Sequence, residues 1–234
     1  GPGGAAWGAN AANGVINIIT KKPADTQGLF LSQTLTSRLD SFTHMRYGFS
    51  EGPLEARLSA GYDSMPEIGV REGDGLHDFA RIPRVNLRTT YRFDEQRRLD
   101  IDAGYLDSVL GAPNDAAGSR WFAQSSFLRL RYTWQEGPDD TWHIQYYLNR
   151  HTLDQSQGGV WTRTVQHDVE AVRTQAVGER HTLTYGGNVR VGHMTNGDPF
   201  QFGQTGIRFD NERTHNHLAG LFIQDRFEAS DAWT

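Results

Sequence analysis

Apolar and polar side chains alternate along most of the chain from Gly28 onward, the pattern of β-strands with two different faces. In the segment 54–63, Leu54, Leu58 and Tyr62 fall on one face, and Arg57 and Asp63 fall on the other. The same period of two runs through 84–93, 99–105, 122–134, 142–149 and 183–191. The stretches 29–36, 162–175 and 214–225 alternate less regularly, so we predict strands there without assigning their faces.

The connections between these segments alternate between short and mostly longer ones. Short polar turns are predicted at 50–53, 94–97, 136–140, 177–181 and 228–232. Between them lie connections that are mostly longer, at 65–81, 109–120, 155–160 and 196–211, and one tight connection at 38–41. We therefore predict an all-β fold: a partial antiparallel transmembrane β-barrel of about ten strands, with short turns at one end and long loops at the other.

Strand length and aromatic placement favour a membrane barrel over the alternative, a soluble β-sandwich. Several segments alternate over about ten residues, whereas strands of soluble proteins typically have about 5 to 6. Aromatic side chains gather where strands meet the short turns, at Tyr47, Phe49, Tyr91, Phe93, Tyr132, Trp134 and Trp142. Such rings suit the headgroup level of a bilayer, so we interpret them as an interfacial girdle.

Composition excludes several other classes. With 37% hydrophobic residues among 234 and a mean hydropathy of −0.61, no run approaches the roughly 20 apolar residues of a membrane-spanning helix. The net charge of −5 argues against a nucleic-acid binder. The chain has no cysteine, which excludes disulfides and thiolate metal sites. Because it begins at Gly1 without Met, we expect it to be a fragment or a processed piece.

The opening GPGGAAWGANAANGVINIITK differs in composition from everything after it. It closely resembles the end of the plug domain in TonB-dependent outer-membrane receptors, although Trp7 stands where Tyr is more usual and Gly4 where Ser often sits. The motif is carried by Gly1, Pro2, Gly8, Gly14, Val15, Asn17, Ile18 and Thr20. A phosphate-cradling loop is the alternative, but no Gly-Lys-Ser/Thr follows, and these glycines precede the apolar run.

The resemblance implies a domain organisation and a function. It implies that residues 1–22 close a plug, with a strand over Val15–Thr20, that 23–27 are a linker, and that 28–234 form the N-terminal part of a barrel of roughly 22 strands. The implied function is active uptake of a scarce ligand across a Gram-negative outer membrane, energised through the TonB complex, whose contact region would precede Gly1. A ferric siderophore is the commonest ligand class, with heme, cobalamin and oligosaccharides as alternatives. The implied partners are outer-membrane lipid, the TonB complex and an iron chelate, without a cofactor or enzymatic activity; a passive porin would lack the plug ending.

Ligand-contact candidates lie on the predicted inward rows and near the long loops. Several arginines on one wall suit an acidic iron chelate, although such arginines also commonly form ion pairs within a wet lumen. An aromatic ring just past a loop is either a ligand platform or part of an outer girdle. Because long loops on rigid scaffolds often bind ligands, we expect 65–81 and 196–211 to face outside. The candidates are Arg71, His77, Arg81, Arg84, Arg88 and Trp121.

Two further pairs carry less specific signals. Asp100 and Asp102 share one face and suggest an acid–base pair, but arginines on the preceding strand favour ion pairing. His215 and His217 also share a face, yet two imidazoles without a third ligand nearby are weak grounds for a metal site. The chain lacks a nucleophile-elbow motif, so we predict neither a catalytic nor a metal site.

Overall fold

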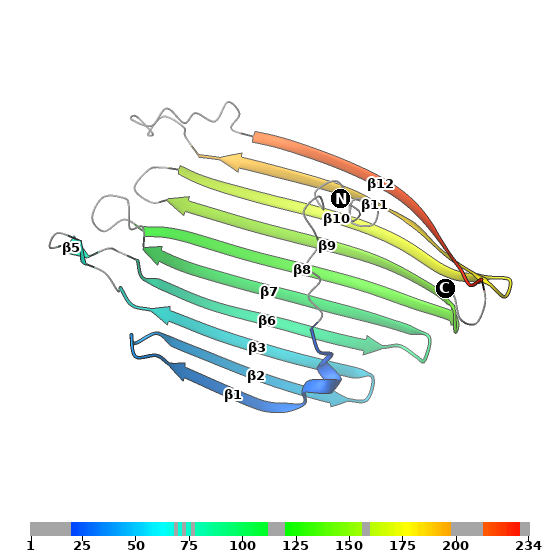
Figure 1. Ribbon diagram of the computed structural model, residues 1–234, viewed down its shortest axis with the longest axis horizontal. Coiled ribbons are helices and arrows are strands. Elements are labelled where there is room, and N and C mark those ends of the chain that lie inside the picture. The colour runs from blue at the N-terminus through cyan, green and yellow to red at the C-terminus, as the bar shows by residue number, and fades with distance from the viewer. Residues whose placement is uncertain are drawn as a thin grey trace.

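The computed structural model describes residues 20–67, 70–71, 74–75, 78–111, 120–155, 160–197 and 213–229. These residues form one open antiparallel sheet of ten strands in the order β1-β2-β3-β6-β7-β8-β9-β10-β11-β12, a plain meander (Figure 1). The strands are β1 (Gly28–Leu35), β2 (Ser41–Glu51), β3 (Leu54–Met65), β6 (Ala80–Arg92), β7 (Arg97–Gly111), β8 (Arg120–Gly137), β9 (Asp140–Gln155), β10 (Val160–Val177), β11 (His181–Asn196) and β12 (Arg213–Phe227). The prediction of an all-β chain with about ten antiparallel strands is confirmed.

Short turns join the strands at one end of the sheet, which we call the short-turn end; the opposite end is the long-loop end. The short turns fall between β2 and β3, β6 and β7, β8 and β9, and β10 and β11, as predicted, and lie at the right of Figure 1. Gly52 and Gly178 adopt positive φ angles of 54° and 66° in two of them. In a third turn, Asp94 Oδ1 accepts hydrogen bonds from the backbone N–H groups of Gln96 and Arg97, at 3.0 and 2.7 Å.

Two elements were not anticipated from the sequence. The predicted linker contains a 3₁₀ helix, η1 (Pro23–Thr26), with Pro23 near its start. The predicted loop 65–81 contains a two-stranded antiparallel pair, β4 (Val70–Arg71) and β5 (Asp74–Gly75). Both elements are short, and neither carries the periodicity by which longer elements are found.

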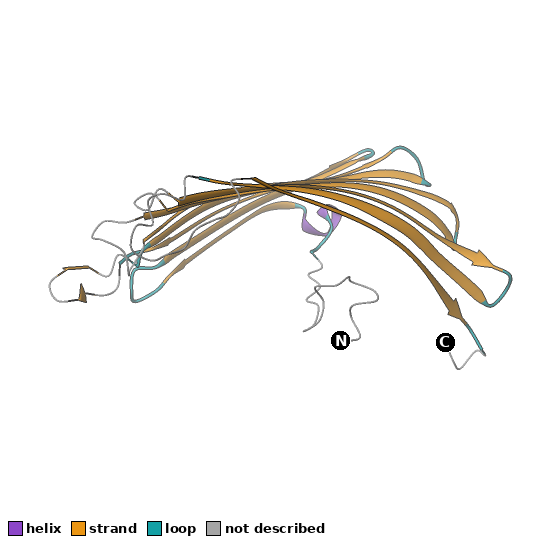
Figure 2. Ribbon diagram, turned by 90° about the horizontal axis from the view of Figure 1, so that it is seen from above, coloured by secondary structure: helices purple, strands orange, loops and turns teal. Residues whose placement is uncertain are grey.

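The sheet is a curved shell with η1 on its concave side (Figure 2). Arg57 fixes the inner side, because its Nη1 donates to the backbone O of Lys21 at 3.0 Å. Gly48 permits the approach of η1, since a Cβ at that position would collide with the carbonyl O of Thr26. Parity along each strand then assigns the polar rows to the concave face and the apolar rows to the convex face. This alternation assigns faces to the three irregular stretches as well: Leu29, Val169 and Leu221 are convex.

Large apolar side chains on the convex face have no second layer of described residues to cover them. Within the ten strands as described, the buried apolar side chains are Ala56, Ala80 and Val172, whereas Leu58 is 48% exposed and Ile144 54% exposed. Aromatic rings run along this face at the short-turn end: Tyr91 contacts Phe93 with centroids 5.0 Å apart, and Phe93 lies 6.2 Å from Tyr132. The sheet therefore has one apolar and one polar surface, with an aromatic row bordering the apolar one.

Candidate functional site

The concave face carries a continuous charged row across four strands. Arg57, Arg88, Asp102 and Arg129 stand opposite one another in register on β3, β6, β7 and β8. Asp102 Oδ1 lies 3.1 Å from Arg88 Nε, and its Oδ2 accepts a hydrogen bond from Arg129 Nε at 2.8 Å. One carboxylate thus serves two guanidinium groups, so the row keeps an excess of positive charge.

A second ion pair lies on this face toward the long-loop end. Arg84 Nη1 donates to Asp63 Oδ2 at 2.6 Å, while Arg84 Nη2 lies 3.1 Å from His44 Nδ1. His44 Nε2 lies 3.3 Å from the same Arg84 nitrogen and 3.6 Å from Asp63 Oδ1. The three side chains orient one another across β2, β3 and β6.

The charged pattern continues onto the later strands. Arg190 Nε donates to Asp168 Oδ2 at 2.8 Å, joining β11 to β10. His143 Nε2 lies 3.5 Å from Glu170 Oε1, and its Nδ1 lies 3.2 Å from Arg131 Nη2. The Nε atom of Arg131 is buried without a hydrogen-bond partner among the described residues. That N–H is a donor available to a further acidic or carbonyl oxygen.

A basic cavity of about 220 Å³ lies on the concave face beside η1, near the short-turn end. Its walls combine the cations Lys22, Arg88, Arg92, Arg98, Arg129 and Arg131 with two carboxylates, Glu55 and Asp100, together with Pro23 and Thr90. The carboxylates are engaged: Glu55 Oε1 lies 3.0 Å from Arg92 Nη2, and Asp100 Oδ1 accepts from Thr90 Oγ1 at 2.6 Å. With six cations against two anions, this cavity favours an anionic occupant.

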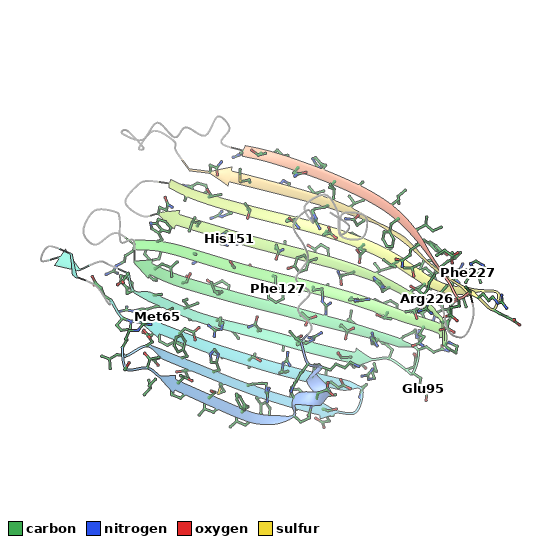
Figure 3. The ribbon with its side chains drawn as sticks, viewed as in Figure 1. Met65, Glu95, Phe127, His151, Arg226 and Phe227 are labelled. Atoms are coloured by element: carbon green, nitrogen blue, oxygen red, sulfur yellow. The ribbon has the colours of Figure 1, made fainter. Side chains whose placement is uncertain are left out.

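A second concavity, of about 530 Å³, spans β8 to β12 closer to the long-loop end. Its concave-face side chains are uncharged or imidazole groups: Ser125, Phe127, Asn149, His151, Thr164, Gln166, Met194, Thr214 and Asn216. Phe127 and His151 are labelled in Figure 3, and His151 Nδ1 lies 2.8 Å from Ser125 Oγ. We call this surface the neutral groove. It offers amide and hydroxyl groups beside one aromatic ring, and such polar groups fix the orientation of a bound small molecule.

The structure separates the predicted ligand-contact residues instead of gathering them. Arg84 and Arg88 are concave and already ion-paired, and Arg88 Nη1 also contacts Thr20 Oγ1. Arg81 lies on the convex side, with its guanidinium 5.8 Å from the Phe79 ring centroid. Trp121 shares the concave parity of Arg129. The side chain of Arg71 and all of His77 lie outside the described residues, as do the motif positions Gly1, Pro2, Gly8, Gly14, Val15, Asn17 and Ile18 and most of the loop 196–211.

The structure also locates the two less specific pairs. Asp100 and Asp102 are both concave, and arginines contact each of them, as the ion-pairing interpretation predicts. His215 and His217 are convex, and His215 Nδ1 lies 3.0 Å from His193 Nδ1 on the neighbouring strand. Within the described ranges, no group of three or more His, Asp or Glu side chains is arranged to hold a metal ion. Residues of the neutral groove escaped sequence analysis because isolated Asn, Gln and Thr on a strand carry no motif.

Comparison with protein-family models gives no match, and comparison with curated proteins gives none either. None of the helical segments in the described part of the chain has the length and apolar character needed to cross a bilayer.

Proposed function

We propose that this chain forms part of the wall of a TonB-dependent outer-membrane receptor and takes part in the uptake of a scarce anionic ligand, with ferric siderophores as the favoured class. The observation that carries the proposal is the two-faced sheet: an apolar convex surface bordered by aromatics, and a charged concave surface. This combination suits a strand wall with lipid on one side and water on the other.

The convex face supports the membrane part of the proposal. A soluble sandwich would cover its apolar face with a second sheet, but the one element packed on a face of the described sheet, η1, lies on the polar side. The exposed apolar surface extends over every strand, from Leu29 on β1 to Ile223 on β12. Soluble monomers rarely expose contiguous patches beyond a few hundred Å². A hydrocarbon phase is the natural cover for such a face.

The entry of the chain supports a plugged lumen over an open channel. Thr20 and Lys21, the last residues of the plug-like motif, contact Arg88 and Arg57 on the concave face. The end of the motif therefore lies on the side that would be the lumen. A passive porin needs no such inner segment, so the opening motif and the seating of η1 both favour the receptor.

The concave face supports an acidic ligand. The basic cavity supplies guanidinium groups for carboxylate, hydroxamate or catecholate oxygens, and the neutral groove supplies amide and hydroxyl partners nearer the long loops. The chemistry is binding and release, so no residue is required to form or break a covalent bond. Energy for release would come through the TonB complex, acting on the plug.

Uptake of ⁵⁵Fe-labelled chelates by a Gram-negative host without its own chelate receptors tests the proposal. Cells producing the full-length receptor should take up one chelate class saturably, and uptake should stop in a TonB-deficient host or with a protonophore. Asn149→Ala, in the neutral groove, should weaken ligand binding about two- to tenfold, the value of one hydrogen bond. Leu148→Ala, its convex neighbour, should leave affinity unchanged. Uptake that persists without TonB would contradict the receptor function and favour a passive porin.

A further inference from the structure

The two ends of the convex face differ in how their cations are neutralised. At the short-turn end, Arg97 Nε donates to Asp94 Oδ2 at 2.6 Å, and Arg173 Nη2 donates to Asp140 Oδ2 at 2.8 Å. His181 Nδ1 at the same end lies 2.7 Å from Asp225 Oδ2. Each of these basic groups on the convex border therefore has a carboxylate partner.

The long-loop end, in contrast, has four convex arginines with no carboxylate partner among the described residues: Arg81 on β6, apart from the others, and three that lie near one another on β9, β10 and β12. Arg150 on β9, Arg163 on β10 and Arg213 on β12 are exposed and share the convex parity. Among the described residues, none of the three forms an ion pair with a carboxylate; Arg163 instead lies 5.8 Å from the centroid of the Trp161 ring. Asp154 is also convex at this end, but it stands opposite Trp161 and Phe122. We call Arg150, Arg163 and Arg213 the arginine rim.

Two histidines lie between these arginines, in the adjoining register positions of β11 and β12. His193 and His215 are direct cross-strand partners with their Nδ1 atoms 3.0 Å apart. One nitrogen of this contact donates and the other accepts, so at least one of the two rings is neutral. The fixed positive charge of the rim therefore comes from its guanidinium groups.

The height of the rim matches a headgroup layer. Arg163 lies fourteen residues along β10 from Val177, and Arg213 lies fourteen residues along β12 from Phe227. The aromatic Trp142 on β9 stands opposite Arg173 on β10, and Arg163 lies ten residues along β10 from that position. At about 3.4 Å per residue and a tilt of about 45°, ten residues rise roughly 24 Å, which reaches the far edge of an apolar band about 25 Å tall. Arg150, eight residues from Trp142, rises about 19 Å and needs its flexible stem to reach the same level.

We propose that the arginine rim binds the phosphate-bearing headgroups of lipids whose acyl chains cover the convex face below it. This inference rests on the membrane placement in the proposed function and adds a binding site to it. Apolar side chains directly below the rim, Leu148, Val169 and Val191, provide the surface for acyl chains. Guanidinium groups bind phosphate oxygens with two parallel hydrogen bonds, which a zwitterionic headgroup with a shielded phosphodiester satisfies less well. The neutralised short-turn end lacks this preference, so the lipid site is confined to one leaflet.

The test is lipid binding to the full-length receptor in uncharged detergent, measured by native mass spectrometry with phosphatidic acid and phosphatidylcholine as probes. The wild type should prefer phosphatidic acid. At about fivefold per cation near an anionic headgroup, Arg163→Gln should weaken phosphatidic acid binding about fivefold, and R150Q/R163Q/R213Q should weaken it roughly a hundredfold. Arg38→Gln, the same charge change in the β1–β2 turn at the same end, should leave binding unchanged.

Two further arms separate the alternatives. The charge-retaining variant R150K/R163K/R213K should bind within about tenfold of the wild type, which distinguishes lost charge from lost folding. Excess inorganic phosphate should displace phosphatidic acid only weakly if acyl chains contribute; full displacement would reduce the rim to a free-anion site and overturn the lipid assignment. Equal binding of the two lipids, or no effect of the triple glutamine variant, would also overturn it. If the wild type shows TonB-dependent uptake but no preference for phosphatidic acid, the lipid site of the arginine rim is refuted and the receptor function is not. If the wild type shows the lipid preference but no uptake, the receptor function is refuted and the lipid site is not.

Discussion

Replacing Leu87 by Arg should destabilise the protein in a bilayer, while the same replacement at the neighbouring Asn86 should be tolerated. Leu87 is convex and stands in register between Leu58 and Ala103, with 40% of its surface exposed. Asn86 is concave and exposed on the same strand. The pair therefore tests the two faces with one chemical change, one residue apart.

The magnitude follows from the depth of Leu87. It lies four residues from Tyr91 in the aromatic row; at about 3.4 Å per residue and a tilt of about 45°, that is roughly 10 Å into an apolar band about 25 Å tall. Arginine near the midplane of such a band costs about 2 to 4 kcal/mol. Arginine on a wet lumen wall avoids that desolvation, so Asn86→Arg should cost less than about 1 kcal/mol, mainly by repulsion from Arg84 and Arg88.

Reversible denaturant unfolding of the full-length protein in zwitterionic lipid vesicles, followed by tryptophan fluorescence, measures both free energies. The reasoning requires the unfolding free energy of Leu87→Arg to fall by at least about 2 kcal/mol relative to Asn86→Arg. Equal losses for the two variants would mean that both faces are wet. A larger loss at Asn86 would invert the assignment of faces throughout the sheet, because parity links every strand to β6.

Three further variants test the turn, the seating of η1 and the charged row. The Arg97 side chain donates a hydrogen bond to Asp94 and holds the pKa of that carboxyl below its ordinary value. The ionised carboxylate therefore stabilises the folded protein fully above the unfolded pKa of about 3.9, and this contribution is lost as the pH falls through the lower folded pKa. Asp94→Asn should remove this pH dependence of Tm. Gly48→Ala places a methyl against the Thr26 carbonyl and should cost about 1 to 3 kcal/mol and speed tryptic cleavage after Lys21, whereas Gly137→Ala, with open space around it, should change neither. Asp102→Asn strips Arg88 and Arg129 of their shared carboxylate and should cost about 3 kcal/mol in the same unfolding assay; an unchanged value would show that the row is fully solvated.

The fold was predictable because a period of two leaves little freedom. Once Leu58 and Arg57 are on opposite faces, β3 can pair with β6 only in registers that differ by two residues, and the structure places Leu58 beside Leu87. Turn positions followed from polar residues interrupting the alternation, and the predicted turn at 94–97 matches the Asp94 hydrogen bonds. The 3₁₀ helix η1 was missed because four residues cannot display a helical period, and its position depends on a contact with Gly48, distant in sequence.

The candidate site was less predictable, because alternation gives the face of a residue and not its partners. Arg84 and Arg88 were singled out correctly as concave, but Asp63 and Asp102 engage them across neighbouring strands. The cations with no carboxylate partner among the described residues include the convex Arg150, Arg163 and Arg213, which belong to the irregular stretches or to the loop-proximal ends of strands. Pairing depends on cross-strand register, which a single sequence specifies only after the turns are known.

The concave and convex faces each leave positive charge uncompensated at one place, and the two places are distinct. On the concave face, carboxylates on β3, β7 and β10 neutralise much of the guanidinium charge, and the excess is concentrated in the cavity beside η1. On the convex face, Arg97 and Arg173 have carboxylate partners at the short-turn border, whereas the arginine rim has none among the described residues. The same solvent at both ends of the sheet would not explain this difference in ion pairing. A phosphate-bearing lipid layer at the long-loop end explains it, because that layer supplies the anions that stabilise cations without a carboxylate partner.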